Sequence, residues 1–96
     1  MNSIYISGSI TNNPNYISEF ETAERKLLKQ YDNVLNPADI LKDLSPDTPY
    51  SSYIRICLGF IDTVDTMYMM KGWEESKGAR FEHEYAEIFG KEIIYE

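Results

Sequence analysis

The sequence predicts an α/β protein in which a small parallel β-sheet is covered by helices on both faces. The chain alternates short apolar, β-rich runs with longer segments of helical periodicity, and strict alternation of this kind favours a parallel sheet. Its 96 residues suffice for one modest hydrophobic core and are too few for two. We therefore expect a single domain over residues 1–96.

The first half of the chain predicts two strands separated by a helix. Residues 4–7 form a β-rich run that ends at Gly8. From residue 16 to residue 31, apolar side chains recur at spacings of three and four, which predicts an amphipathic helix. Residues 33–35 predict a short strand that Asn36 and Pro37 stop. Two prolines and three aspartates in residues 38–49 predict a long loop.

The second half repeats this alternation. Helical spacing returns after residue 51, and the compact run at residues 66–70 fits a strand buried on both faces. Residues 79–89 predict a third helix, which Gly90 can end as a C-cap. Residues 92–95 predict the last strand. Right-handed crossovers give the strand order 2-1-3-4 with three helices, a small three-layer fold of the Rossmann or flavodoxin-like type.

Charge and composition exclude several classes of partner. The net charge is −7, with 16 acidic against 9 basic residues, and no basic block occurs, so we expect no nucleic-acid or membrane partner. Cys57 is the one cysteine, which excludes an internal disulfide, and no Cys/His spacing suits a metal. We expect no metal and no cofactor. The sequence shows no secretory leader pattern and no membrane-spanning run, which favours a cytoplasmic location.

The predicted topology places a ligand crevice at the carboxyl ends of the first and third strands, where the strand order reverses. Ser7, Gly8 and Ser9 follow the first strand, and their N–H and hydroxyl groups can hold an anion. Ser76 and Gly78 precede the third helix, whose positive end also attracts an anion. The alternative interpretation is a simple turn for the first loop and an N-cap for Ser76. A cap is compatible with a ligand.

Glu82 is the candidate for covalent chemistry. It lies near the start of the third helix, where we expect the helix dipole to keep its carboxylate ionised. Such a carboxylate can attack a sugar anomeric carbon, as in retaining glycosidases, or can simply complement the dipole. Tyr5 can hydrogen-bond Glu82 or belong to the core. Trp73 can stack on a base or cover the core, and His83, without a partner in the sequence, is expected at the surface.

These motifs resemble the nucleoside 2-deoxyribosyltransferase-like family almost from end to end. The likeness covers residues 5–10, residues 36–38 and, most specifically, residues 72–82, which read Gly-Trp-Glu-x-Ser-x-Gly-Ala-x-x-Glu. Compact versions of this motif are common among bacteriophage and prophage proteins of unassigned role. The family breaks the N-glycosidic bond of 2-deoxynucleosides or their 5-phosphates, passing the sugar through an ester on a glutamate to another base or to water.

The resemblance implies a role for individual residues. Glu82 matches the nucleophile and Tyr5 the tyrosine that orients it. The two serine-glycine loops match the phosphate-binding loops. A serine at position 76 is typical of the branch that hydrolyses 2′-deoxynucleoside 5′-monophosphates, whereas base-exchanging members carry an aspartate there. The implied base and sugar pocket comprises Ile10, Asn36, Cys57 and Trp73.

One departure from the family pattern concerns the leaving base. The family's base-side acid is an aspartate eight residues before the one that introduces the third strand, here Asp65, and that position is Cys57. A thiol is a poor proton donor to a leaving base, and general acid assistance is worth about 10²- to 10⁴-fold. Asp62 lies about 140° further around the helix and cannot simply substitute.

Three hypotheses remain open on the sequence. The chain can be an enzyme that cleaves or transfers at the N-glycosidic bond of a nucleoside 5′-monophosphate. It can instead bind a nucleotide, a nucleotide-sugar or an ADP-ribose-like signalling molecule and sequester it without turnover. It can also have a structural role on a retained fold. Under the first two hypotheses we expect a homodimer or higher homo-oligomer, because so small a chain needs a neighbour to close its pocket.

Overall fold

The structure is a computed structural model that describes residues 2–96. Its elements follow in the order β1 (Ser3–Ser7), α1 (Tyr16–Leu27), β2 (Asn33–Leu35), α2 (Pro37–Ile40), α3 (Tyr50–Asp62), β3 (Thr66–Met69), the 3₁₀ helix η1 (Trp73–Glu75), α4 (Lys77–Ile88) and β4 (Glu92–Tyr95). All strand pairs are parallel and the sheet order is β2-β1-β3-β4. The predicted fold class and strand order are confirmed.

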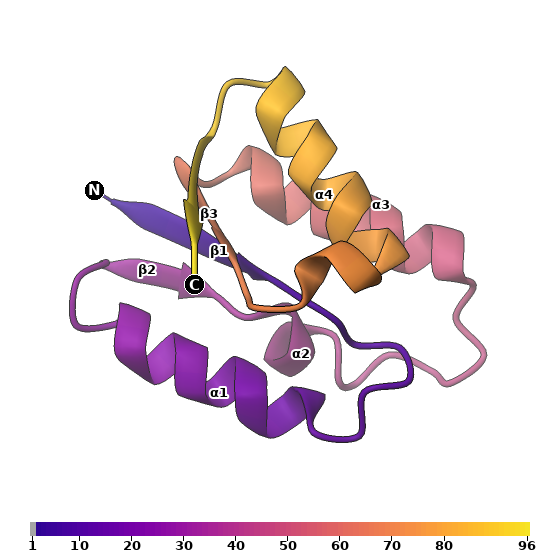
Figure 1. Ribbon diagram of the computed structural model, residues 1–96. Helices are drawn as coiled ribbons and strands as arrows, with labels where there is room; N and C mark the ends of the chain where they lie inside the picture. Colours follow the sequence, from indigo (N-terminus) through magenta and orange to yellow (C-terminus); the bar gives the residue numbers. More distant parts are fainter. Residues whose placement is uncertain (1) are drawn as a thin grey trace.

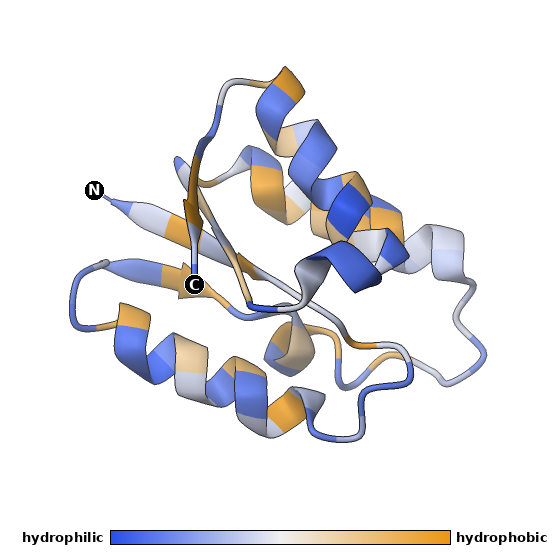
Figure 2. Ribbon diagram, in the orientation of Figure 1, coloured by the Kyte–Doolittle hydropathy of each residue, from blue (hydrophilic) through white to orange (hydrophobic). Residues whose placement is uncertain are grey.

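The helices lie on opposite faces of the sheet, with α1 on one side and α3 and α4 on the other (Figure 1). Alternation along β1 explains this division. Ile4 and Ile6 pack with Phe20 of α1, whereas Tyr5 packs with Ile61 of α3 on the other face. Figure 2 shows hydrophobic and hydrophilic residues alternating along α1 and α4, as expected for helices that bury one side.

The sequence missed the short helix α2 and the 3₁₀ helix η1. Residues 37–40 lie in the predicted long loop but form the short helix α2. Its start is specified locally, because the Asn36 side chain accepts hydrogen bonds from the N–H groups of Ala38 and Asp39. Pro37 occupies the first helical turn, where its missing N–H costs nothing. The Asn-Pro pair that stops β2 therefore also begins a helix.

The adjacent carboxyl ends of β1 and β3 define the place of the site. Ser7 pairs with Met69 at the end of the ladder, and the Met70 N–H donates to the Ser7 carbonyl at 2.9 Å. Gly8 follows directly, and a Cβ atom there would lie 2.9 Å from the Met70 sulfur. A glycine at position 8 therefore lets the two strand ends stay close together.

Candidate functional site

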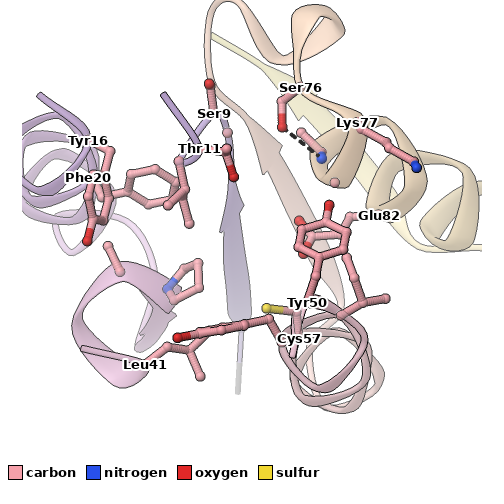
Figure 3. Close-up of a pocket in the computed structure, with 18 of the residues that line it drawn as sticks. Ser9, Thr11, Tyr16, Phe20, Leu41, Tyr50, Cys57, Ser76, Lys77 and Glu82 are labelled. Atoms are coloured by element: carbon pink, nitrogen blue, oxygen red, sulfur yellow. Dashed lines mark hydrogen bonds between the residues drawn. The ribbon is translucent and has the colours of Figure 1, made fainter. Parts of the chain in front are cut away.

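A cavity of about 620 Å³ opens at the carboxyl end of β1. It is lined from one side by Tyr16 and Phe20 of α1 and from the other by the start of α4, with residues after β1 between them (Figure 3). Its volume is within the usual range for small-molecule sites, about 300–1,000 Å³. The cavity thus lies where the topology predicts a ligand crevice.

Glu82 of α4 lies at the floor of this cavity and is only 7% exposed. The Ser7 hydroxyl donates to its Oε1 at 2.7 Å, and the Tyr5 hydroxyl donates to its Oε2 at 3.0 Å. Each carboxylate oxygen therefore has one hydroxyl donor and retains a lone pair for another partner. The three side chains come from segments about 75 residues apart, and they form one buried polar group.

Burial is the largest influence on the pKa of Glu82. Burial raises the pKa of Glu82, while the hydrogen bonds from Ser7 and Tyr5 oppose this shift. Glu82 is the sixth residue of α4, and the dipole acts mainly within the first turn. Burial therefore works against the ionised form of this carboxylate, which the sequence led us to expect. Burial also raises the pKa of Tyr5 well above its usual value, so its hydroxyl stays a donor.

The start of α4 presents backbone donors to the same cavity. Ser76 caps the helix, with its hydroxyl accepting from the Ala79 N–H at 3.2 Å. The N–H groups of Lys77 and Gly78, at the first two helical positions, have no intrahelical acceptor. Ser9 lines the cavity from the loop after β1. Both serine-glycine loops therefore contribute to one cavity.

The predicted site residues differ in where the structure places them. Those that line the cavity are Tyr5, Gly8, Ser9, Ile10, Cys57, Ser76, Gly78 and Glu82. Ser7 lies beneath them, 1% exposed and bonded to Glu82. Asn36 is buried behind the lining, where it caps α2 and donates to Glu24 at 3.0 Å, so its observed contacts are structural.

Trp73 does not line the cavity, which differs from the expectation that it stacks on a base. A positive φ of 88° at Gly72 turns the chain into η1, and the Trp73 indole stacks on the His83 ring at a centroid distance of 4.3 Å. His83 also hydrogen-bonds the Tyr95 hydroxyl at 2.7 Å. His83, which was expected at the surface, is partly buried, with 14% of its side chain exposed. It joins η1, α4 and β4.

Cys57 lines the cavity, but its chemistry differs from that of a carboxylic acid. Burial, with the nearby charge of Glu82, raises the pKa of the thiol to about 12. Such a group keeps its proton at neutral pH and releases it reluctantly. Asp62 is engaged elsewhere, accepting a hydrogen bond from the Tyr85 hydroxyl at 2.7 Å. It does not line the cavity, as its angular position on the helix predicts.

Sequence reasoning missed several aromatic and apolar residues of the cavity. These are Tyr16, Phe20, Leu41, Leu44, Tyr50, Tyr53 and Ile54. For the α3 members a signal existed, because Tyr50 and Cys57 are seven residues apart and therefore share a helix face. For Leu41 and Leu44 no local signal pointed to a site.

The part of the chain that the structure describes lacks two kinds of feature. Between residues 2 and 96, no three His, Cys, Asp or Glu side chains are grouped so that they could hold a metal ion. Within the same range, no helix combines the length and apolar character needed to cross a membrane.

The fold and the site define a parallel α/β protein with a buried, doubly hydrogen-bonded carboxylate in a crevice at the reversal of strand order. The solved structure of a 2-desoxiribosyltransferase from Leishmania mexicana shares this fold, with a TM-score of 0.72 and 24% sequence identity. The alignment covers 99% of this chain and 63% of that protein, so this chain spans less than two thirds of its length.

The family follows from a match over nearly the whole sequence. Residues 2–95 match the family described as a domain of unknown function, DUF4406, and the chain belongs to that family. No curated protein sequence matches this chain.

Proposed function

We propose that this protein binds a nucleoside 5′-monophosphate and cleaves or transfers its sugar at the N-glycosidic bond, with Glu82 as the nucleophile. The observation that carries the proposal is the Glu82 carboxylate at the cavity floor, held by hydroxyl donors from Ser7 and Tyr5. A carboxylate fixed in this way has a defined direction of attack. The fold shared with a 2-desoxiribosyltransferase is in keeping with this chemistry.

The cavity offers suitable surroundings for each part of such a ligand. The N–H groups at the start of α4 and the hydroxyls of Ser9 and Ser76 suit the phosphate. The apolar wall formed by Tyr16, Phe20 and Leu41 on the far side suits the base (Figure 3). The sugar would then lie between these walls, above Glu82.

The proposed reaction proceeds through an ester. A lone pair of Glu82 attacks the anomeric carbon, the bond from that carbon to the base nitrogen breaks, and its electrons leave with the base, which takes up a proton. Water or a second base then attacks the same carbon and releases Glu82. Because burial raises the pKa of Glu82, the nucleophilic form is favoured by rising pH. We expect turnover to increase with pH until Glu82 is fully ionised.

Binding without turnover is a second candidate, and Cys57 favours it. The leaving base needs a proton, yet the residue on the cavity side of α3 is a thiol with a pKa of about 12 rather than a carboxyl group. A nucleotide-derived molecule could then occupy the cavity without losing its base. This alternative predicts tight binding of a nucleotide or ADP-ribose-like ligand with no release of free base.

Base release distinguishes the two candidates. Purified protein is incubated with each deoxynucleoside 5′-monophosphate, and free base is measured by chromatography, with Glu82→Ala as the control. Release that depends on Glu82 supports the enzyme. Binding by calorimetry without release supports the second candidate, and neither binding nor release from any substrate would overturn both.

A further inference from the structure

Tyr50 is a half-exposed aromatic residue whose hydroxyl reaches into the proposed phosphate end of the cavity. It is the first residue of α3 and is 51% exposed, yet it lines the cavity together with Cys57 (Figure 3). An alanine Cβ at Gly78 would lie 2.8 Å from the Tyr50 hydroxyl oxygen. The hydroxyl therefore lies against the second residue of α4.

The position of this hydroxyl relative to α4 indicates what it can contact. Side chains of a helix leave sideways and tilt toward its N-terminus, whereas the free N–H groups point along the axis. The Tyr50 oxygen lies next to the place where a Gly78 side chain would begin, so we place it beside those N–H groups rather than in front of them. An anion held by the N–H groups would have the hydroxyl at its edge.

We propose that Tyr50 is a specificity-determining residue that donates a hydrogen bond to the 5′-phosphate, and that Gly78 lacks a side chain to make room for it. This inference rests on the proposed function and adds a residue that distinguishes a nucleoside 5′-monophosphate from a free nucleoside. Burial and the charge of Glu82 raise the pKa of Tyr50, so the hydroxyl keeps the proton that it must donate.

The direct test removes the hydroxyl and keeps the ring. Tyr50→Phe is titrated with the four common deoxynucleoside 5′-monophosphates and the matching deoxynucleosides by calorimetry. We expect about a tenfold loss of affinity for the monophosphates, the low end for a hydrogen bond to a charged group, and no change for the nucleosides. Tyr31→Phe, a tyrosine outside the cavity lining, is the matched control and should change neither affinity.

A double-mutant cycle tests the contact with Gly78. No positive φ accompanies Gly78, so alanine fits the backbone and its Cβ displaces the flexible Tyr50 ring. Gly78→Ala should therefore weaken monophosphate binding about as much as Tyr50→Phe does. Without the hydroxyl, the next contacts of that Cβ are at 3.8 and 3.9 Å, which is ordinary packing. The double variant should consequently bind no more weakly than either single variant.

The outcomes separate the two levels of the proposal. If the wild-type protein prefers monophosphates and Tyr50→Phe keeps that preference, the role of Tyr50 alone is overturned. Additive effects in the cycle would overturn the coupling between Tyr50 and Gly78. A wild-type protein that binds monophosphates no better than nucleosides would overturn the phosphate site itself, and Tyr50 with it.

Discussion

Replacing Ser7 by alanine removes the 2.7 Å hydrogen bond that its hydroxyl donates to the buried Glu82 carboxylate. Ser7 is 1% exposed and Glu82 7% exposed, so the full cost of losing a donor to a charged group applies, about 1.5–3 kcal/mol. In a domain of this size, 1 kcal/mol moves Tm by about 4–8 °C. We expect Ser7→Ala to lower Tm by roughly 6 °C or more at pH 8.

The stability that Ser7→Ala loses should be larger at high pH than at low pH. Burial raises the folded-state pKa of Glu82 above its unfolded value of about 4.3, and the Ser7 hydrogen bond opposes that rise. A raised pKa gives stability that is fully present below the unfolded pKa and is lost as pH rises through the folded pKa. Ser7→Ala raises the folded pKa further. The variant therefore falls further behind wild type as pH rises through the wild-type folded pKa of Glu82, because it goes on losing stability up to its own, higher folded pKa.

Urea denaturation at pH 4 and pH 8 measures the stability lost in Ser7→Ala and its change with pH. Below the unfolded pKa only a hydrogen bond to a neutral carboxyl group is lost, about 1 kcal/mol. Ser18→Ala, an exposed serine of α1, is the matched control and should change stability by less than about 0.5 kcal/mol at both pH values. An equal cost of Ser7→Ala at the two pH values would refute a charged Glu82 as the acceptor.

Three further predictions concern Glu82 and Cys57. Cys57→Asp supplies a carboxyl group on the base side, so we expect the initial rate of base release to increase by about 10²- to 10⁴-fold. An unchanged rate would contradict the idea that base release is slow because Cys57 cannot protonate the leaving base. Glu82→Gln should abolish base release yet raise Tm at pH 8, because it removes a buried charge, while Glu84→Gln on the exposed face of α4 should do neither. The native Cys57 thiol, with a pKa of about 12, should react slowly with iodoacetamide at pH 8 and at an ordinary rate in denaturant, as followed by mass spectrometry. Fast labelling of the native protein would show that burial does not suppress the thiolate.

The errors in the sequence prediction share a physical origin. Residues 37–40 were expected to form a loop because Pro37 and the aspartates that follow are turn-formers, yet the same Asn-Pro pair also starts a helix. Local sequence is compatible with both outcomes. In the helical conformation that the structure shows, Ala38 packs into the core on the α1 side of the sheet.

Local sequence also left the contacts of two aromatic residues, Trp73 and Tyr50, undetermined. The sequence pattern allowed Trp73 either to meet a ligand or to cover the core, and the left-handed turn at Gly72 directs it to His83. Tyr50 lies at a position that the pattern assigned to the edge of a loop, and its hydroxyl still reaches α4. These contacts join different helices of the fold, so the spacing of residues within one helix carries no information about them.

The sequence by itself determined the fold class, the strand order and the location of the crevice. These follow from local periodicity and from the handedness of crossovers, which depend on neighbouring residues and chain chirality alone. Tertiary structure decided that Ser7, Tyr5 and Glu82 share one buried hydrogen-bonded group and that Tyr50 lies against Gly78. It also decided the sign of the Glu82 pKa shift, because desolvation depends on everything packed around the carboxylate rather than on its place along the helix.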